Sequence, residues 1–354
     1  MKNLKKIIAL LLAVVMMMGL FAGCGNSGEG ESEGEKGEVY VFCFGDYFDP
    51  ELEYEFEDLT GYDVIIDYFD TNEELYPVIK NNTVQYDVIC ASDYMISKMA
   101  SESLLGEIDF ANVPNAEYIS DNIKAFIEEF DPGMKYSVPH TWGTYGIMYN
   151  KKMVNEADIN SWNDLWDEKY ADQIIMPDSL REGFMIAGKA LGYSMNTTSE
   201  AELAEMTEYL IQQKPLVYKL ANDSARDLMV GESAALAVIN SGEVLYSQEL
   251  NENLGYIVPE EGTEVWTDCW ALTANAANKE GGEAWLNFML DGGVAEVNFE
   301  YLTYAIPNTQ IAELTSAEVL NPSAELLAKC ETLKNLGPEL DDMYSRYWKA
   351  FKSE

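Results

Sequence analysis

The chain has 354 residues, 62 acidic against 22 basic side chains, a net charge of −40 and a single histidine. This balance excludes nucleic-acid binding and docking on anionic lipid, which both need a basic surface. Hydrophobic residues make up 47% of the chain, so we expect a real core in one large domain or two lobes, not an acidic disordered chain. One histidine also argues against histidine-based catalysis and histidine-rich metal sites, and we expect neither metal nor cofactor. The acidity itself predicts high solubility or a cationic partner.

Residues 1–23 have the pattern of a secretory signal peptide. Three lysines precede an apolar run, Ile7–Leu20, which is too short to span a bilayer comfortably. Small residues before Cys24 resemble the bacterial lipobox, although Phe21 stands where leucine is preferred. We therefore predict a lipoprotein whose acylated Cys24 anchors it to a membrane. An ordinary cleaved signal peptide followed by an incidental cysteine is the alternative.

Residues 24–38 are rich in Gly, Ser and Glu, which is typical of a flexible acidic tether. Cleavage after residue 23 removes three lysines and no acid, which takes the net charge from −40 to −43. No later segment is long and apolar enough to span a membrane. We expect a folded body held by its lipid on the outer face of the cell membrane.

The first part of the folded region alternates apolar strands with amphipathic helices. This order predicts parallel βαβ units, in which ligands lie at the carboxyl ends of strands beside helix N-termini. We therefore expect Phe44–Asp46 and Ser92–Tyr94 at a binding rim. The expected strands are Val39–Phe44, Tyr62–Phe69 and Tyr86–Ala91, and the expected helices are Pro50–Thr60, Asn72–Lys80 and Asp93–Ser103.

The same alternation of strands and helices recurs later in the chain, and the last third is mostly helical. Two α/β lobes with a cleft between them fit this length better than one sheet of ten or more strands. The expected elements are strands at Ile174–Met176, Ala234–Ile239, Tyr256–Val258 and Cys269–Thr273, and a helix at Leu180–Leu191.

Four cysteines follow Cys24, and none has metal-binding spacing. Cys43 and Cys90 both end apolar runs, so a disulfide between them is conceivable. Buried free thiols are the favoured interpretation for these two and for Cys269 and Cys330.

Several segments, in this order and spacing, resemble the substrate-binding proteins of polyamine (spermidine/putrescine) ABC transporters, from about Val39 to Phe351. Each segment is weakly diagnostic alone, and their order and spacing together are specific. They are Asp70–Glu74, Tyr86–Ser92 with Tyr94, Tyr136–Gly143 with Tyr149-Asn150, Ser161–Trp166, Lys169-Tyr170, Asp178–Glu182, Leu191–Ser194 with Asn196–Thr198, Pro259–Gly262, Trp266–Asp268 and Tyr304–Asn308.

The resemblance implies a two-lobed type II periplasmic-binding-protein fold, α/β in class, with the ligand cleft between lobes that close by hinge motion. It implies lobe 1 from residues 39–145 plus 268–304, and lobe 2 from residues 146–267 plus 305–354. The chain is expected to cross between lobes near 137–146, 266–272 and 304–308. The implied function is capture of spermidine or putrescine for an ABC permease and ATPase, without enzymatic activity, by a monomer that binds no nucleic acid.

A polyamine is an apolar rod with ammonium groups, so its cleft needs carboxylates at matching positions and aromatic walls. Carried over by position, Asp268 matches the acid for an inner amine and Trp266 a flat aromatic wall. Glu182 matches the acid for one terminal ammonium, and Asp46 stands at the other end of the rod. The remaining matches are the polar or aromatic contacts Ser92, Tyr94 and Tyr304.

The chain also departs from the family pattern. Phe44 stands where tryptophan is common, and Gly45 where a hydroxyl residue is common. Ser179 stands where an acid often precedes the Arg-Glu pair, and Ile239 stands where a tryptophan often covers the ligand. These changes leave open whether spermidine, putrescine or a longer amine is preferred. Phe44 and Ser179 are still expected to contact the ligand.

Without the resemblance, each of these residues has a simpler interpretation. Trp266 with Asp268 is more often a packed tryptophan beside a surface acid, and Arg181-Glu182 a pair on a helix surface. His140 is interpreted as structural, with a pH-sensitive hinge contact as the alternative.

The sequence leaves two other functions open. One is binding of another solute, a sugar or a ferric ion, on the same fold. The other is an extracellular lipoprotein hydrolase with Glu182 and Asp268 as a glycosidase pair, although the chain has no Gly-x-Ser-x-Gly elbow.

Overall fold

The computed structural model describes residues 36–222 and 224–354, and Lys36–Glu354 form one compact unit. The predicted signal peptide, the acylated Cys24 and most of the 24–38 tether lie outside the described residues. Within the described part of the chain, no helix is long and apolar enough to cross a membrane.

The first group of elements is a parallel βαβ layer, as the sequence predicted. Strand β1 pairs in parallel with both β2 and β3, and helices follow each strand. The strands are β1 (Glu38–Phe44), β2 (Asp63–Phe69) and β3 (Val88–Ser92), and the helices are α2 (Glu51–Thr60), α3 (Asn72–Asn81), α4 (Asp93–Ser101) and α5 (Asp121–Phe130).

Both faces of this layer are buried, which explains the unbroken apolar run of β1. Val39, Val41 and Cys43 point to one face and pack with α2 and with α10 (Lys279–Met289). Phe42 points to the other face and packs with α3, α4 and α5.

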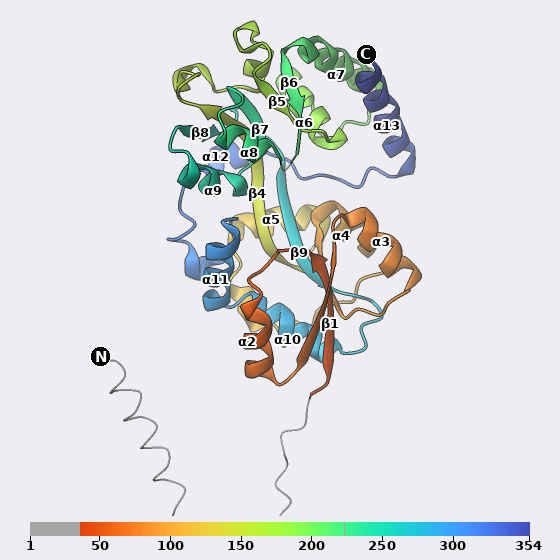
Figure 1. Cartoon of the computed structure of the whole chain (residues 1–354). Coiled ribbons are helices and arrows are strands. Elements are labelled where there is room, and N and C mark those ends of the chain that lie inside the picture. The colour runs from red at the N-terminus through yellow and green to blue at the C-terminus, as the bar shows by residue number, and fades with distance from the viewer. Residues whose placement is uncertain (1–35, 223) are drawn as a thin grey trace, which may run out of the picture. The chain divides into compact units, whose positions relative to one another are not determined.

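Two long strands join this layer to the rest of the sheet (Figure 1). The first part of β4 (Ser137–Asn150) pairs antiparallel with β9 (Val265–Leu272), and β9 pairs with β3. The second part of β4 pairs with β7 (Leu236–Asn240) and β8 (Leu254–Ile257). Beyond β7 the sheet continues with β5 (Ile174–Met176) and β6 (Val217–Leu220), so the strand order is β2-β1-β3-β9-β4-β7-β5-β6. The sequence predicted a crossing segment at 137–146, but not that it forms one continuous strand.

The second group of elements surrounds the far end of β4 and has its own core. One face of its strands packs with α6, α7 and α13, and the other with α8 and α9. These elements are β5 (Ile174–Met176), β6 (Val217–Leu220), α6 (Leu180–Leu191), α7 (Glu200–Gln213), α8 (Ser224–Val230), α9 (Gly242–Leu250) and α13 (Pro338–Ser353).

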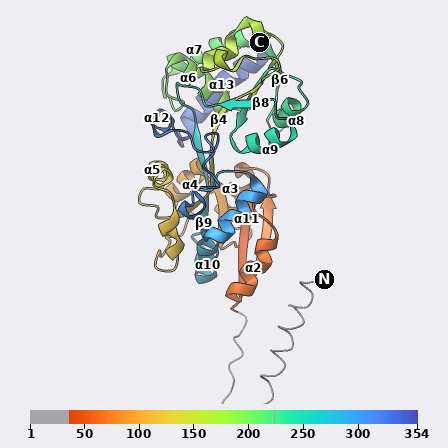
Figure 2. The same cartoon turned by 90° about the vertical axis from the view of Figure 1, so that its left-hand side faces the viewer.

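Figure 2 shows the two groups of elements from another side, again joined by β4 and β9. After β9 the chain is helical, with α10, α11 (Gly292–Leu302), α12 (Ala324–Leu327) and α13. The two-lobed α/β class is confirmed, because two cores lie on either side of the shared strands. The lobe boundaries at 145/146, 267/268 and 304/305 stay a prediction.

Cys43, Cys90, Cys269 and Cys330 are all buried and free. The interpretation as buried thiols is confirmed, and Cys43 and Cys90 form no disulfide. Burial raises the pKa of these thiols, which keeps them unreactive.

Candidate functional site

A cavity of about 1030 Å³ is lined by residues from both groups of elements. It collects every binding residue proposed from the sequence except Ser179. The predicted residues that line it are Phe44, Asp46, Ser92, Tyr94, Glu182, Trp266, Asp268 and Tyr304.

Asp268 lies in the floor of the cavity on β9, directly opposite Ser92 of β3 in the antiparallel ladder. Its side chain is only 8% exposed. The Tyr47 hydroxyl donates to its carboxylate and also lies 2.8 Å from Thr141 Oγ1. Burial raises the pKa of Asp268, while hydrogen bonds from Ser92 and Tyr47 oppose the rise. The strands thus hold a buried carboxylate that accepts hydrogen bonds from the hydroxyl groups of Tyr47 and Ser92.

Trp266 and Tyr304 form an aromatic wall beside this carboxylate, with ring centroids 5.7 Å apart. Two glycines make room for the rings. A Cβ at Gly143 would lie 2.5 Å from the Trp266 ring, and one at Gly242 would lie 2.1 Å from the Tyr304 ring. The two rings can therefore occupy these positions only because residues 143 and 242 are glycines.

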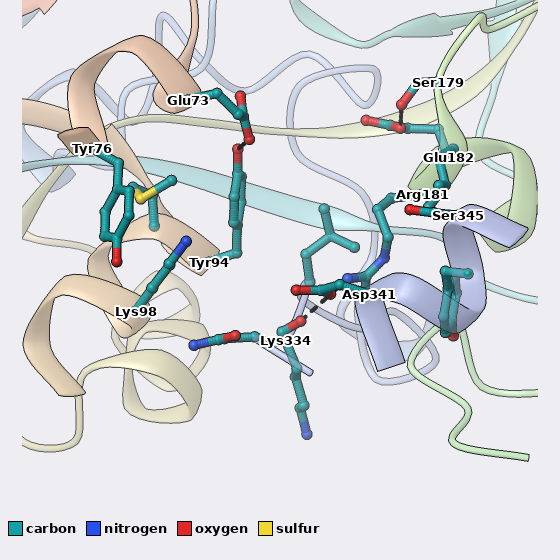
Figure 3. Close-up of a pocket in the computed structure, with 15 residues that line it drawn as sticks. Glu73, Tyr76, Tyr94, Lys98, Ser179, Arg181, Glu182, Lys334, Asp341 and Ser345 are labelled. Carbon is teal, nitrogen blue, oxygen red and sulfur yellow. Dashed lines mark hydrogen bonds between the residues drawn. The ribbon is translucent and has the colours of Figure 1, made fainter. Parts of the chain in front are cut away.

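Glu182 reaches the cavity from the first turn of α6, and Ser179 precedes that helix. The Ser179 hydroxyl donates to the Glu182 carboxylate (Figure 3). Ser179 itself lines two smaller adjoining pockets, and its contact with the ligand stays a prediction. In this structure its hydroxyl holds the Glu182 carboxylate. Burial raises the pKa of Glu182.

Figure 3 shows one of these adjoining pockets, of about 490 Å³. Tyr94 and Lys98 of α4 stand on one side of it, and Arg181 and Glu182 of α6 on the other. The Tyr94 hydroxyl donates to Glu73 Oε1 at 3.1 Å. This pocket and the main cavity share Tyr94 and Glu182, so they are neighbouring parts of one cleft.

Phe44 and Asp46 lie at the loop that follows β1, at the rim predicted for them. The Phe44 ring packs on Phe69 and Tyr47, with centroid distances of 4.5 and 5.2 Å. Asp46 is exposed and has a φ of 52°, in the left-handed region that aspartate tolerates better than most residues. The carboxylate of Asp46 therefore remains in solvent at the mouth of the cavity.

Glu243 was not predicted, although it follows a polar turn at the end of β7 where the strand-end rule could have found it. Its carboxylate accepts from Arg226 Nη1 at 3.0 Å and from the Tyr304 hydroxyl at 2.8 Å. Ile239, on the same strand, lines a smaller pocket of about 270 Å³ together with Glu243 and Glu182.

Glu264 also lines the cavity and was missed, because the sequence offers no signal that separates it from the neighbouring Glu260 and Glu261. Asp93 lies within the Ser92–Tyr94 segment expected at the rim, but it was not proposed as a binding residue. Both are almost fully buried in the cavity wall.

His140 is buried behind the floor, and its Nε2 lies 2.8 Å from the carbonyl oxygen of Tyr47. Burial lowers the pKa of His140 to about 4. The imidazole is therefore neutral at physiological pH and supports the loop that carries Tyr47, in agreement with a structural interpretation.

The charge of the lining decides what the cavity can bind. Among the described residues that line it, eight are acids and one, Arg226, is a cation. Aromatic side chains supply much of the remaining wall, namely Phe44, Tyr47, Phe69, Tyr94, Tyr145, Trp266 and Tyr304. Such a lining suits a ligand that carries several positive charges on an apolar body.

Comparisons with known proteins agree with this geometry. Residues 53–324 match the family described as bacterial extracellular solute-binding protein. The spermidine/putrescine-binding periplasmic protein of Salmonella typhimurium is 31% identical over 322 residues, which cover 89% of this chain and 91% of that protein. The putrescine-binding periplasmic protein PotF of Escherichia coli K12 is 25% identical and covers 90% and 92% of the two chains.

A solved structure extends the similarity to the fold. The spermidine/putrescine ABC transporter substrate-binding protein PotD of Streptococcus pneumoniae superposes with a TM-score of 0.83 at 34% identity, over 89% of this chain and 98% of that one. Fold and sequence therefore agree over nearly the whole described region. The chain belongs to the family of bacterial extracellular solute-binding proteins.

Proposed function

We propose that the protein captures a polyamine, spermidine or putrescine, between its two lobes and delivers it to an ABC importer on the outer side of the cell membrane. The observation that carries this proposal is the cavity lining, with eight acids against one arginine among aromatic side chains. The names of the relatives, which bind spermidine or putrescine, point to the same ligand class.

The rod shape of a polyamine assigns different roles to different acids. Asp268 receives an inner amine in the floor, where Trp266 and Tyr304 flank the methylene groups. Glu182 receives one terminal ammonium, held in position by Ser179. Hydrogen bonds to charged groups contribute about 1.5–3 kcal/mol each, so two or three such contacts reach micromolar affinity after the cost of association.

The mouth of the cavity completes the proposed site. Asp46 receives the second terminal ammonium in solvent, and Phe44 forms the wall beside it. Ser92 and Tyr94 contribute polar and aromatic contacts from the first lobe. We place the hinge where the chain crosses between lobes, with lobe 1 from 39–145 plus 268–304 and lobe 2 from 146–267 plus 305–354.

The remaining parts of the proposal concern how the protein is held and used. Its membership in an extracellular family agrees with a location outside the cytoplasm. We propose that it is a monomer that binds without catalysis, anchored by acylated Cys24 after removal of residues 1–23, and docked by the cognate permease and ATPase.

A ligand panel tests the binding function directly. Putrescine, spermidine and spermine are compared with glucose, glutamate and ferric citrate by thermal unfolding and titration calorimetry. A ligand that binds the folded state at 100 times its Kd stabilises it by about 2.7 kcal/mol, so a polyamine should raise the Tm by several degrees. A shift with a sugar or ferric citrate and none with any polyamine would show that the solute class is wrong.

The anchor is tested separately by Cys24→Ala. The unaltered protein should sediment with membranes, and the variant should be released in soluble form. An equal membrane-bound fraction for both proteins contradicts acylation at Cys24 and leaves the binding function untouched.

A further inference from the structure

Two acids in the cavity wall are buried more deeply than Asp268. Glu264 immediately precedes β9 and is 2% exposed, and Asp93 begins α4 and is 1% exposed. Asp93 Oδ1 accepts the backbone N–H of Tyr94 at 2.6 Å. Within residues 36–222 and 224–354, Asp93 Oδ2 and Glu264 Oε2 have no hydrogen-bond partner. Each carboxyl group thus has an oxygen atom that no protein donor satisfies.

Other charged groups surround Glu264 from three elements. Glu182 and Arg181 face it from α6, Asp93 from α4, and Asp268 from β9. Glu331 forms a backbone bridge with Glu264, but the Glu331 carboxylate turns to Lys189 at 2.6 Å.

Arg181 is the cation among these groups, and its donors are directed elsewhere. Its guanidinium donates to Asn196 Oδ1 at 2.9 Å and to the Lys334 carbonyl oxygen at 3.3 Å, and it lies 5.3 Å from the centre of the Tyr344 ring. In the described part of the chain, no ion pair within 4.0 Å joins Arg181 to a carboxylate. The acids around Glu264 are therefore not neutralised by direct pairing.

A buried carboxylate without a partner is costly, and nearby acids add to the cost. Burial raises the pKa of Glu264 well above its ordinary value, and the charges of Glu182 and Asp93 raise it further. Burial and the charge of Asp268 also raise the pKa of Asp93, while hydrogen bonds from the backbone N–H groups of Tyr94 and Thr267 oppose the rise. The unliganded site therefore retains protons on these groups at a pH where an exposed acid has lost them.

We propose that Glu264 and Asp93 form an ammonium subsite in the cleft wall beside Asp268, which gives up protons when a polyamine cation enters. This rests on the proposed function and adds two residues and a proton exchange to it. In the exchange, a carboxyl O–H bond breaks, its proton passes to the buffer, and a ligand N–H donates to the carboxylate that remains. An ammonium fits better than a metal ion, because no three His, Cys, Asp or Glu side chains in the described residues are placed to hold one.

The test is titration calorimetry of spermidine into the purified protein in phosphate and in Tris at the same pH. The two buffers differ in protonation enthalpy, so the difference in observed binding enthalpy counts the protons released. We expect proton release by the unaltered protein and less by Glu264→Gln. Between pH 6 and 7.5, where spermidine keeps its charges, the affinity of the unaltered protein should rise, and at pH 7.5 Glu264→Gln should bind roughly tenfold more weakly.

Glu260→Gln is the matched control, because Glu260 is an exposed glutamate four residues away and outside the main cavity. It should leave both the proton count and the affinity unchanged. Asp93→Asn is a second variant of the subsite and should also lower the proton count. Thermal unfolding of each variant verifies that it is folded.

The outcomes separate the inference from the function on which it rests. No polyamine binding by the unaltered protein overturns both. Binding without proton release, or a proton count that Glu264→Gln and Asp93→Asn leave unchanged, overturns the subsite while the binding function stands.

Discussion

Asp268 in the strand-built floor and Glu243 in the helical wall of the cleft are held in opposite ways. In the floor, Asp268 is bound by the hydroxyls of Tyr47 and Ser92. In the wall, Glu243 at the start of α9 is paired with Arg226 at 3.0 Å and also accepts from Tyr304. Among the described residues the first acid forms no ion pair within 4.0 Å, whereas the second already has a cation.

This difference predicts where affinity is concentrated. A carboxylate satisfied by hydroxyls keeps its charge available, so a ligand ammonium adds an interaction that the free protein lacks. A carboxylate that is already paired with arginine must give up this partner to bind a ligand ammonium. Its net gain in binding free energy is therefore smaller. Asp268 should therefore supply more binding energy than Glu243, which should only adjust the affinity.

The largest expected effect comes from the floor. Asp268→Asn keeps the shape of the side chain but removes its charge, and spermidine affinity should fall about 100-fold, because a charge-assisted hydrogen bond is lost within a buried site. Calorimetry measures the loss, and Tm measures folding. Asp58→Asn, at an exposed position on α2, is the control and should bind normally. Retained affinity in Asp268→Asn would contradict the assignment of the floor.

The sequence predicted the floor better than the wall, for a physical reason. Apolar runs that end in polar residues indicate strand ends, which placed Phe44–Asp46 and Ser92–Tyr94 at the rim. Trp266 and Asp268 came from the family resemblance alone, because the expected strand began only at Cys269. Glu264 was missed, since its environment arises from α4 and α6, which are remote in the sequence.

The next effect concerns the stability of the unliganded protein. The pKa of Glu264 is raised in the folded state, so folding favours its protonated form. Its stabilising contribution is complete below the unfolded-state pKa of about 4.3 and is lost as pH rises through the folded-state pKa. Without ligand, Glu264→Gln should therefore have the higher Tm, by a few degrees at pH 8 and less at pH 5.

Thermal unfolding across this pH range checks the sign. A gap between Glu264→Gln and the unaltered protein that does not widen with pH would contradict the raised pKa. Glu260→Gln again serves as control and should follow the unaltered protein at every pH.

A smaller effect on spermidine affinity should come from removing the arginine that pairs with Glu243. Arg226→Gln removes the partner of Glu243 and leaves its carboxylate free for the ligand. Because partly exposed ion pairs contribute about 0.2–1 kcal/mol, spermidine affinity should rise by at most about fivefold. Lys219→Gln removes an exposed positive charge outside the cavity and controls for net charge. A loss of affinity in Arg226→Gln, or an equal gain in Lys219→Gln, would contradict the idea that the ligand ammonium competes with Arg226 for Glu243.

The strand β4 could not be recognised in the sequence, for a different reason. The strand β4 carries Pro139, Gly143 and Gly146, which weaken any strand pattern. The structure uses two of these residues for close packing, because a Cβ at Gly143 would meet Trp266 and one at Gly146 would meet Tyr256. Gly143, which weakens the strand pattern in the sequence, thus makes room for the Trp266 side chain of the cleft.

The smallest expected effect concerns the rate of ligand release, which depends on how far the cavity wall covers the bound ligand. Ile239 lines the pocket of about 270 Å³ beside Glu182 and Glu243, so an indole at this position would extend into the cleft. Ile239→Trp should slow spermidine release roughly twofold, since an aromatic face at a solvent-exposed site attracts an ammonium by about 0.5 kcal/mol. Stopped-flow displacement measures the off-rate, with Leu59→Trp on the exposed face of α2 as control. An unchanged off-rate would place Ile239 outside the path of the ligand and would leave Arg226 and Glu243 as the part of the wall that adjusts binding.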